Sequence, residues 1–561
     1  MNRGTIWDRV LQKKSIKRLN DESDERESNG QSLHKSLNLL DLTCFGIAAV
    51  VGAGIFSTLG RAAADGGPAV AILFLLTAIA CLFSALCYSE FASRIPVSGS
   101  AYTYSYVVFG ELIAWLIGWN LLMEYGIGNS VVAFSWSDYF SNILNGMGFP
   151  LPDWLQNDYY SCSEAVGKTG ELKATDTKLI EIWNSAPVIG TLRIIFDLPA
   201  LALNLIITAL VYIGIHESKM VSNAMVFLKL SVVIGVIVIG SFYVTPENWV
   251  PFAPNGATGV LQGIAAVFFT YIGFDAISTT AEECKNPKRD LPRATMLTLA
   301  ICTVLYIILA FVLTGMVSYA ELRVDDPLAV VFTKHNLNWL SGIISLSAVV
   351  AMASVFLVFQ LGQPRIFMSM ARDGLLPQRF AKIHPKFKTP SFSTVVTGFA
   401  VALPIVFLNS QLVTDLSALG TLFAFVLVSG GILALSDTDR EHGSEAPGFR
   451  VPYFNGKFIV VSLLAIYSYF MRSMPLNHDL TRDWSAEKIP YFVFYAVFVW
   501  LAAMTWVRRW SLIPVLGVIT NLYLIAGIGH LNWLRFGVWC AIGLMVYFAY
   551  GYRRSRLRVN E

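Results

Sequence analysis

The chain carries little charge for its length. Of its 561 residues, 14% are Asp, Glu, Lys or Arg, whereas 55% are hydrophobic, and its mean hydropathy is +0.57. A soluble globular chain has about 25% charged residues. The composition therefore argues against a soluble protein and indicates a membrane protein. The net charge of +3 is not interpreted as a sign of nucleic-acid binding, because the basic clusters lie beside the apolar segments.

Patterns for disulfides, metals and catalysis are also missing from the sequence. Five of the seven cysteines fall inside apolar runs, and only Cys162 falls in a predicted outside loop, so no disulfide framework is expected. No Cys-x-x-Cys pair or His/Cys cluster indicates a metal, and we expect no cofactor. The seven histidines lie mostly at segment ends and in loops and form no nucleophile–base pattern, which argues against an enzyme.

The N-terminus has no cleavable signal peptide. Its first 35 residues are polar and charged and are predicted to form a flexible cytoplasmic tail. Lys and Arg are biased to one side of the predicted topology: about 29 of the 41 fall on the side of this tail. By the positive-inside rule both termini are expected in the cytoplasm, with an even number of spans.

Apolar runs of about 20 residues, the length that crosses a bilayer, recur along the chain. We predict an all-α membrane protein with fourteen spans. They cover residues 39–61, 68–93, 109–140, 194–214, 221–243, 259–280, 295–317, 339–368, 393–409, 413–435, 457–475, 490–507, 512–529 and 533–551. The long outside loop at 142–192 is expected to form a small cap or to lie on the surface, with disorder as the alternative.

Five parts follow from these spans. They are a cytoplasmic tail (1–35), a ten-helix core (36–436), a cytoplasmic linker (437–456), four accessory helices (457–552) and a basic cytoplasmic tail (553–561). Within the core, the two repeats are predicted at 36–243 and 259–436.

The first span is interrupted in its middle by Gly52-Ala53-Gly54-Ile55-Phe56. Glycine costs about 1 kcal/mol in a helix interior, and inside a membrane the freed N–H and C=O groups have no water to bond. Such a break is tolerated where it lines a cavity, so it indicates a binding site. The alternative is a glycine-rich packing seam between helices.

A second break lies in span six, in Tyr271-Ile272-Gly273-Phe274-Asp275. The two breaks are five spans apart, at corresponding positions of two five-helix halves. An odd number of spans per half makes the halves inverted, and this is the pattern of an inverted-repeat transporter.

Three ionisable residues stand out among those inside predicted spans: Glu124, Lys229 and Asp275. Each is costly in a membrane and is by default a candidate functional residue. Lys229 is a candidate for proton coupling, with snorkelling to the cytoplasmic surface as the alternative. For Glu124 the alternative is a structural contact between helices, and for Asp275 we favour capping of the second half of the broken helix.

The sequence resembles the amino acid/polyamine/organocation (APC) superfamily, specifically the bacterial members of the cationic amino acid transporter family, over about residues 35–552. The resemblance rests on seven motifs. They are Gly52 to Phe56, Pro96 to Tyr102, Gly118 to Tyr125, Phe268 to Asp275, Glu282 to Pro287, Met370 to Pro377, and Trp533 to Phe536 with Tyr547 to Gly551.

The resemblance implies a LeuT-type five-plus-five inverted repeat with four accessory helices, and a free L-amino acid bound between the broken helices. The substrate carboxylate would meet the N–H groups of Ala53, Gly54 and Ile55, at the positive end of a half-helix. The substrate ammonium would meet carbonyls near Ile47 and in the second break. The residues implied there are Phe269, Thr270 and Ile272, and Phe269 would also be an aromatic lid.

The resemblance also assigns roles to two of the ionisable residues. Family members commonly carry a lysine at the position of Lys229, which would bond to backbone near Gly46 and Ile47 and couple transport to protons. Glu124 would contact the substrate or join the proton path.

Substrate choice and coupling are less clear from the sequence. A bulky Met352 in span eight would shorten the pocket and favour small neutral amino acids or a broad range, with cationic amino acids as the alternative.

A channel is disfavoured because the intramembrane charges are few and isolated. An exchanger or facilitator without proton coupling, and an amino acid sensor, stay open. The expected partners are the substrate and the lipid bilayer of the cell membrane, with no nucleic acid; the oligomeric state is open, and a monomer is compatible with the sequence.

Overall fold

The structure is a computed structural model of the whole chain. It describes residues 10–16, 19, 35–95, 97, 99–168, 174–190, 192–214, 219–324, 326–387, 389–435, 448–473 and 486–559. Most of the predicted N-terminal tail, residues 437–447 of the predicted linker, the last two residues of the basic tail, and Pro96 and Ser98 of the second motif lie outside the described residues.

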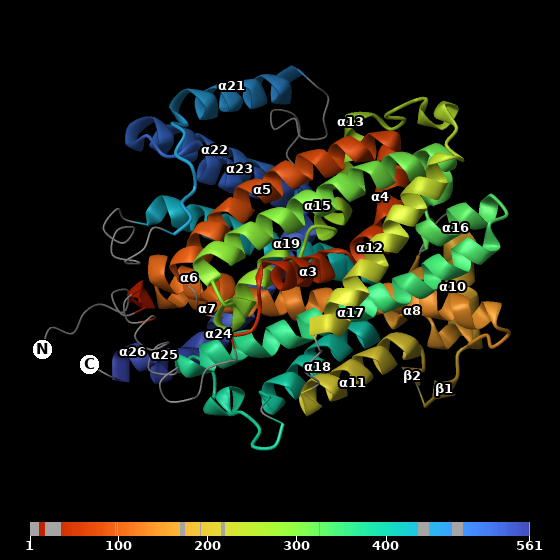
Figure 1. The fold of residues 1–561 in the computed structure, drawn as a ribbon, viewed down its shortest axis with the longest axis horizontal. Coiled ribbons are helices and arrows are strands. Elements are labelled where there is room, and N and C mark those ends of the chain that lie inside the picture. The colour runs from red at the N-terminus through yellow and green to blue at the C-terminus, as the bar shows by residue number, and fades with distance from the viewer. Residues whose placement is uncertain are drawn as a thin grey trace, which may run out of the picture.

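Long α-helices packed side by side make up most of the described chain (Figure 1). The helices of the first half are α3 (Leu39–Val50), α4 (Leu59–Gly66), α5 (Val70–Arg94), α6 (Ser100–Val108), α7 (Glu111–Leu122), α8 (Gly128–Gly146), α9 (Tyr159–Gly167), α10 (Ala174–Ser185), α11 (Leu198–Ile213) and α12 (Lys219–Ser241). Those that follow are α13 (Gly256–Gln262), α14 (Ile264–Phe269), α15 (Pro287–Met316), α16 (Pro327–Lys334), α17 (Asn338–Arg372), α18 (Ser391–Phe407) and α19 (Ser410–Ala434). The last are α21 (Lys457–Ser473), α22 (Ile489–Arg508), α23 (Leu512–Gly527), α24 (His530–Val546), α25 (Tyr552–Arg554) and α26 (Arg556–Val559).

Shorter turns of helix join or interrupt these elements. The π-helical turns are η1 (Gly54–Thr58), η3 (Met123–Ile127) and η10 (Tyr547–Gly551). The 3₁₀ turns are η2 (Gly67–Ala69), η4 (Asp153–Leu155), η5 (Pro246–Trp249), η6 (Phe274–Glu283), η7 (Tyr319–Leu322), η8 (Gln378–Ala381) and η9 (Ala486–Lys488).

Helical segments occur at all fourteen predicted spans. Among the described residues, eight helical segments are long and apolar enough to cross a membrane, and five apolar helices of 10–17 residues are shorter. The all-α membrane class is therefore confirmed, whereas the count of fourteen crossings, the inverted repeat and the orientation stay predictions.

The beginning of α3 shows how local sequence sets a helix boundary. Asn38 and Asp41 form a capping box, in which each side chain accepts a hydrogen bond from the other residue's backbone N–H at 3.1 Å. These bonds satisfy N–H groups that have no partner within the helix. The predicted first span therefore begins where its polar flank supplies a cap.

Three pairings of long helices hold the core together. α15 packs along α5, α17 along α8, and α19 along α23. The third pairing joins an accessory helix to the core, although α21–α23 also share a small apolar cluster of their own around Phe494 and Phe498. The accessory helices are thus attached to the core through α23 and also through α24, which contacts α7 and α19.

Residues 142–192, predicted as an outside cap, fold as a small unit. It comprises α9, α10 and the hairpin of β1 (Val188–Ile189) and β2 (Leu192–Arg193), and its core contains Cys162 and Ile182. Burial raises the pKa of the Cys162 thiol to about 12. This thiol therefore stays protonated and unreactive near neutral pH.

The N-terminal segment differs from the flexible tail that the sequence predicted. Val10, Ile16 and Leu19 are buried, and the Lys14 ammonium pairs with Asp373 at 2.9 Å. Asp373 also accepts, through its carbonyl, from the backbone N–H of Arg556 at 3.0 Å. Apolar side chains and one ion pair thus fix part of the tail, and Asp373 links it to the C-terminal end of the described chain.

Candidate functional site

The first break lies where α3 ends. Val51 is extended, with φ −82° and ψ 93°, so the helix stops there. The chain resumes at η1, where the N–H groups of Ile55 and Phe56 donate to the Gly52 carbonyl at 3.1 and 3.2 Å. The interruption predicted at the glycines is therefore present and begins at Val51. The carbonyls at the end of α3 face a buried interior without helical partners, so other groups must satisfy them.

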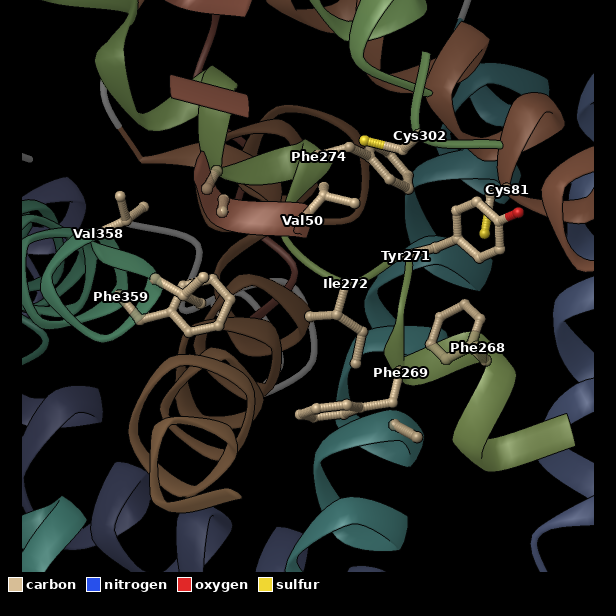
Figure 2. Packing of buried hydrophobic residues seen from close by; sticks show 14 of the residues in the cluster. Val50, Cys81, Phe268, Phe269, Tyr271, Ile272, Phe274, Cys302, Val358 and Phe359 are labelled. Carbon is tan, nitrogen blue, oxygen red and sulfur yellow. The ribbon is translucent and has the colours of Figure 1, made fainter. Parts of the chain in front are cut away.

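The second break separates α14 from η6. α14 ends at Phe269, residues 270–273 form a turn, and η6 begins at Phe274. Gly273 has φ +112°, a conformation that favours glycine. Figure 2 shows the side chains of Phe268, Phe269, Tyr271, Ile272 and Phe274 at this turn, with Tyr271 and Ile272 on different sides. All five belong to the main apolar core, where Phe268 and Phe274 both pack against the ring of Phe425.

The two breaks touch each other. A Cβ on Gly54 would lie 2.5 Å from the Cα of Thr270, and a Cβ on Gly273 would lie 3.0 Å from the Cβ of Ala49. Both contacts are too short for any residue larger than glycine unless the backbone shifts. The glycines are therefore needed for direct contact between the interrupted helices, which brings the predicted residues of both breaks into one region.

Lys229 of α12 is bonded to the end of α3. Its Nζ donates to the carbonyls of Ala48 at 3.0 Å and Val51 at 2.9 Å, and to the hydroxyl of Ser354 at 3.2 Å. The residue is 1% exposed, so the snorkelling alternative is wrong in this structure. The resemblance implies contacts near Gly46 and Ile47. The acceptors in the structure are Ala48, next to Ile47, and Val51 at the end of α3, where carbonyls lack helical partners.

Glu124 lies in η3, a π-turn within the long helix α7–α8, and is fully buried. Neither of its carboxylate oxygens has a hydrogen-bond partner among the described residues. Asp275 lies close enough to interact with it, and Asp275 accepts from the Tyr125 hydroxyl at 2.7 Å. Capping of η6 by Asp275 is wrong, because the N-cap position of η6 is Gly273 and no side chain caps this turn.

The remaining predicted substrate residues are all buried in the same interior. Their carbonyls are partly used: Ile47 accepts from the Val51 N–H at 2.9 Å, and Phe269 from the Ile272 N–H at 3.3 Å. A carbonyl oxygen has two lone pairs, so each can accept a second bond. The predicted residues concerned are Ile47, Ala53, Gly54, Ile55, Phe269, Thr270 and Ile272. Their role in binding stays a prediction.

Met352 is fully buried in α17. Val355, one turn further along the same helix face, is the residue that a Cβ on Gly52 would meet at 2.5 Å. α17 thus passes directly beside the first break, and Met352 is on the face that approaches it.

The sequence analysis gave no role to Tyr125 and did not identify Ser354, although both bond to its candidate residues. Tyr125 directly follows Glu124, so its position beside an intramembrane acid was a usable signal. Ser354 is an ordinary serine in an apolar run, and only the packing of α17 against α12 reveals its contact with Lys229.

Comparison with known proteins places this arrangement in a family. Residues 37–501 match the family model described as "Amino acid permease", and residues 511–555 match the model of the C-terminus of that family. The chain is 37% identical to the branched-chain amino acid permease BcaP of Bacillus subtilis, over 98% of this chain and 99% of that protein.

Two further relatives carry other names. The methylthioribose transporter of Bacillus subtilis is 36% identical over 95% of this chain and 96% of that protein. The vacuolar cationic amino acid transporter 4 of Arabidopsis thaliana is 31% identical over 94% of this chain and 93% of that protein. These matches cover nearly the whole chain, including the accessory helices.

The contact between the breaks gives a stability prediction. Gly54→Ala forces a methyl group against the Thr270 backbone, and overpacking of this kind costs about 1–3 kcal/mol. We expect a lower melting temperature of the detergent-solubilised protein. Gly342→Ala in α17 is the matched control, since no heavy atom lies within 4 Å of its added Cβ. Equal melting temperatures for the two variants would contradict the close contact.

Proposed function

The chain belongs to the amino acid permease family of the APC superfamily, and on that basis we propose that it takes up L-amino acids by proton-coupled alternating access. Membership makes it a multi-pass membrane protein and a transporter rather than an enzyme. Proton coupling, the choice of substrate and the identity of the site residues belong to the proposal.

The observation that carries the proposal is the position of Lys229. Its ammonium is buried and bonds to two carbonyls at the end of α3, beside the first break. A protonated amine donates three hydrogen bonds, whereas a neutral one donates fewer and carries no charge. Loss of the proton would therefore weaken the link between α12 and α3. This supports a mechanism in which protonation biases the position of the broken helix.

Backbone groups would hold the substrate. The N-terminal end of η1, at Ala53 and Gly54, offers N–H groups to a carboxylate, with the helix dipole favouring a negative charge. Carbonyls around Ile47 and Phe269 would accept from the substrate ammonium. This mode of binding needs no cationic side chain. The contact of the two breaks at glycines supports it, because that contact brings their backbone groups into one region.

The names of the relatives leave several substrates to test. One is named for branched-chain amino acids, one for methylthioribose and one for cationic amino acids. The buried Met352 favours small neutral amino acids or a broad range, because a large apolar side chain shortens the space beside the first break. We therefore propose neutral L-amino acids as the main class, with cationic ones as the alternative.

An exchanger or facilitator without proton coupling, or a sensor that binds without transport, would keep the same breaks. A sensor would bind an amino acid without accumulating it. An exchanger would accumulate it without a proton gradient, provided that an amino acid is present inside. The uptake experiment below separates these alternatives.

Proton coupling predicts the behaviour of Lys229→Ala. Uptake of radiolabelled Ala, Leu, Arg, Lys and methylthioribose is measured in proteoliposomes with and without an inward proton gradient. We expect the wild type to accumulate at least one amino acid with the gradient, and Lys229→Ala to lose that accumulation while still binding the substrate, because the variant has no proton to gain at this position.

Lys334→Ala is the matched control, because Lys334 is a partly exposed lysine paired with Glu321 at the surface. It should accumulate substrate like the wild type. Uptake that responds neither to the gradient nor to Lys229 would instead indicate an exchanger or facilitator, and the coupling role of Lys229 would be withdrawn.

The pocket role of Met352 gives a separate prediction. Met352→Ser removes most of a large apolar side chain from the face of α17 that approaches the first break. We expect uptake of Arg and Lys to rise relative to uptake of Ala, because the pocket becomes longer and more polar. Met368→Ser, at another buried methionine four turns further along α17, is the control. Unchanged Arg and Lys uptake in Met352→Ser would place Met352 outside the pocket.

A further inference from the structure

A charged cavity of about 400 Å³ lies beyond the two breaks, at the end of the bundle away from Lys14 and Asp373. Its volume falls in the range of about 300–1,000 Å³ that is typical of small-molecule sites. Five polar side chains line it: Arg61, Asp65, Arg323, Gln411 and Asp415. No role in the proposed transport mechanism has been given to any of them. In the predicted orientation this cavity faces the outside.

The cavity is close to the predicted substrate site. Arg61 is seven residues after Gly54, and seven residues of helix span about 10 Å. Ala266, which also lines the cavity, accepts from the Thr58 hydroxyl at 3.2 Å and lies three residues before Phe269. The cavity is therefore separated from the breaks by one or two helical turns of the same elements, α4 and α14.

Positive and negative groups are arranged as pairs in this cavity. Arg61 donates to the amide oxygen of Gln411 at 3.2 Å, and the amide nitrogen of Gln411 donates to Asp415 at 3.0 Å. Arg323 forms an ion pair with Asp65. The Gln411 amide thus accepts a hydrogen bond from the Arg61 guanidinium with its oxygen and donates one to the Asp415 carboxylate with its nitrogen.

A free amino acid has the same polarity. Its carboxylate accepts hydrogen bonds and its ammonium, two bonds away, donates them. An amino acid that replaced the Gln411 amide would place its carboxylate on Arg61 and its ammonium on Asp415, and both bonds would then be charge-assisted and stronger than those of an amide. The arrangement thus matches a zwitterion better than it matches an ion of one sign.

The accessory helix α24 holds the Asp415 carboxylate in place. Asn532 of α24 donates to Asp415 at 3.0 Å, and Arg535 donates to the amide oxygen of Asn532 at 2.8 Å. Gly527 and Ile528, at the end of α23, also line the cavity. The accessory helices therefore form part of the wall and orient the Asp415 carboxylate.

We propose that this cavity is a transit site for zwitterionic amino acids, in which the carboxylate binds Arg61, the ammonium binds Asp415, and the side chain of Gln411 is displaced. Asn532 is a positioning residue that orients Asp415. The proposal rests on the proposed amino acid transport, and it assigns to two accessory helices a part in substrate entry.

The test compares uptake kinetics with equilibrium binding. Uptake of radiolabelled L-alanine or L-leucine, whichever the wild type transports faster, is measured for the full chain in proteoliposomes, and equilibrium binding of the same amino acid is measured in detergent. Arg61→Gln should lower kcat/KM about tenfold, as expected for the loss of a charged hydrogen-bond partner. Its Kd should change less than twofold, because the site at the breaks is intact.

Three further variants sharpen the result. Asn532→Ala should lower kcat/KM about threefold, since Asp415 loses one of its two orienting bonds. Gln411→Ala should lower KM, because the substrate no longer has to displace the amide. Lys334→Gln removes a positive charge from the pair with Glu321, which lies outside the cavity lining, and should leave kcat/KM and Kd unchanged.

Each other outcome overturns the proposal. An equal loss of binding and uptake in Arg61→Gln would assign Arg61 to folding or to the site at the breaks. Unchanged uptake in Arg61→Gln would place the cavity off the substrate route. A wild-type chain that neither binds nor transports any amino acid would refute the proposed function itself, and this inference with it.

Discussion

The need to satisfy backbone carbonyls where a helix stops inside an apolar core controls much of this structure. α3 ends at Val50, and three carbonyls at this end receive hydrogen bonds from elsewhere. The Lys229 ammonium donates to Ala48 and to the C-cap residue Val51, and the Tyr306 hydroxyl donates to Val50 at 3.1 Å. Without such donors each buried carbonyl would cost about 1–3 kcal/mol. The break is therefore stable only with α12 and α15 packed against it, which links the position of the broken helix to the core around it.

The structure also depends on small residues where the helices come into close contact. Gly54 meets the Thr270 backbone, Gly273 meets Ala49, and Gly46 meets Ile277 and Thr298, each at a distance that excludes a Cβ without movement of a neighbour. The sequence reading left a choice between glycines that bind a ligand and glycines that pack helices. The structure shows close packing at all three positions. The two readings are compatible, because packing of this kind brings the unsatisfied backbone groups of both breaks into one region.

The helices and the two breaks could be predicted because they depend on local properties, namely runs of apolar residues and glycines within them. The partners of the buried ionisable groups could not, because they depend on the packing of segments far apart in sequence. The sequence identifies Lys229 as a candidate, yet its acceptors, Ala48 and Val51, lie one and four residues after Ile47, the nearer of the two predicted positions. Asp275 was assigned to a cap, whereas its carboxylate meets Tyr125, 150 residues away. The N-terminal tail was judged from its overall polarity, which concealed the few apolar residues that pack.

The accessory helices show why a domain division drawn from sequence can separate parts that act together. Their apolar cluster around Phe494 is distinct from the main core, although Val426 and Leu433 of α19 also pack against it. Yet α23 packs along α19, and Asn532 of α24 bonds to Asp415 of α19. α19 also carries Gln411, which bonds to Arg61 of the first broken helix. A movement of that half-helix would therefore be opposed or followed by α19 and, through it, by the accessory helices. Their attachment constrains the helix that the proposed mechanism needs to move.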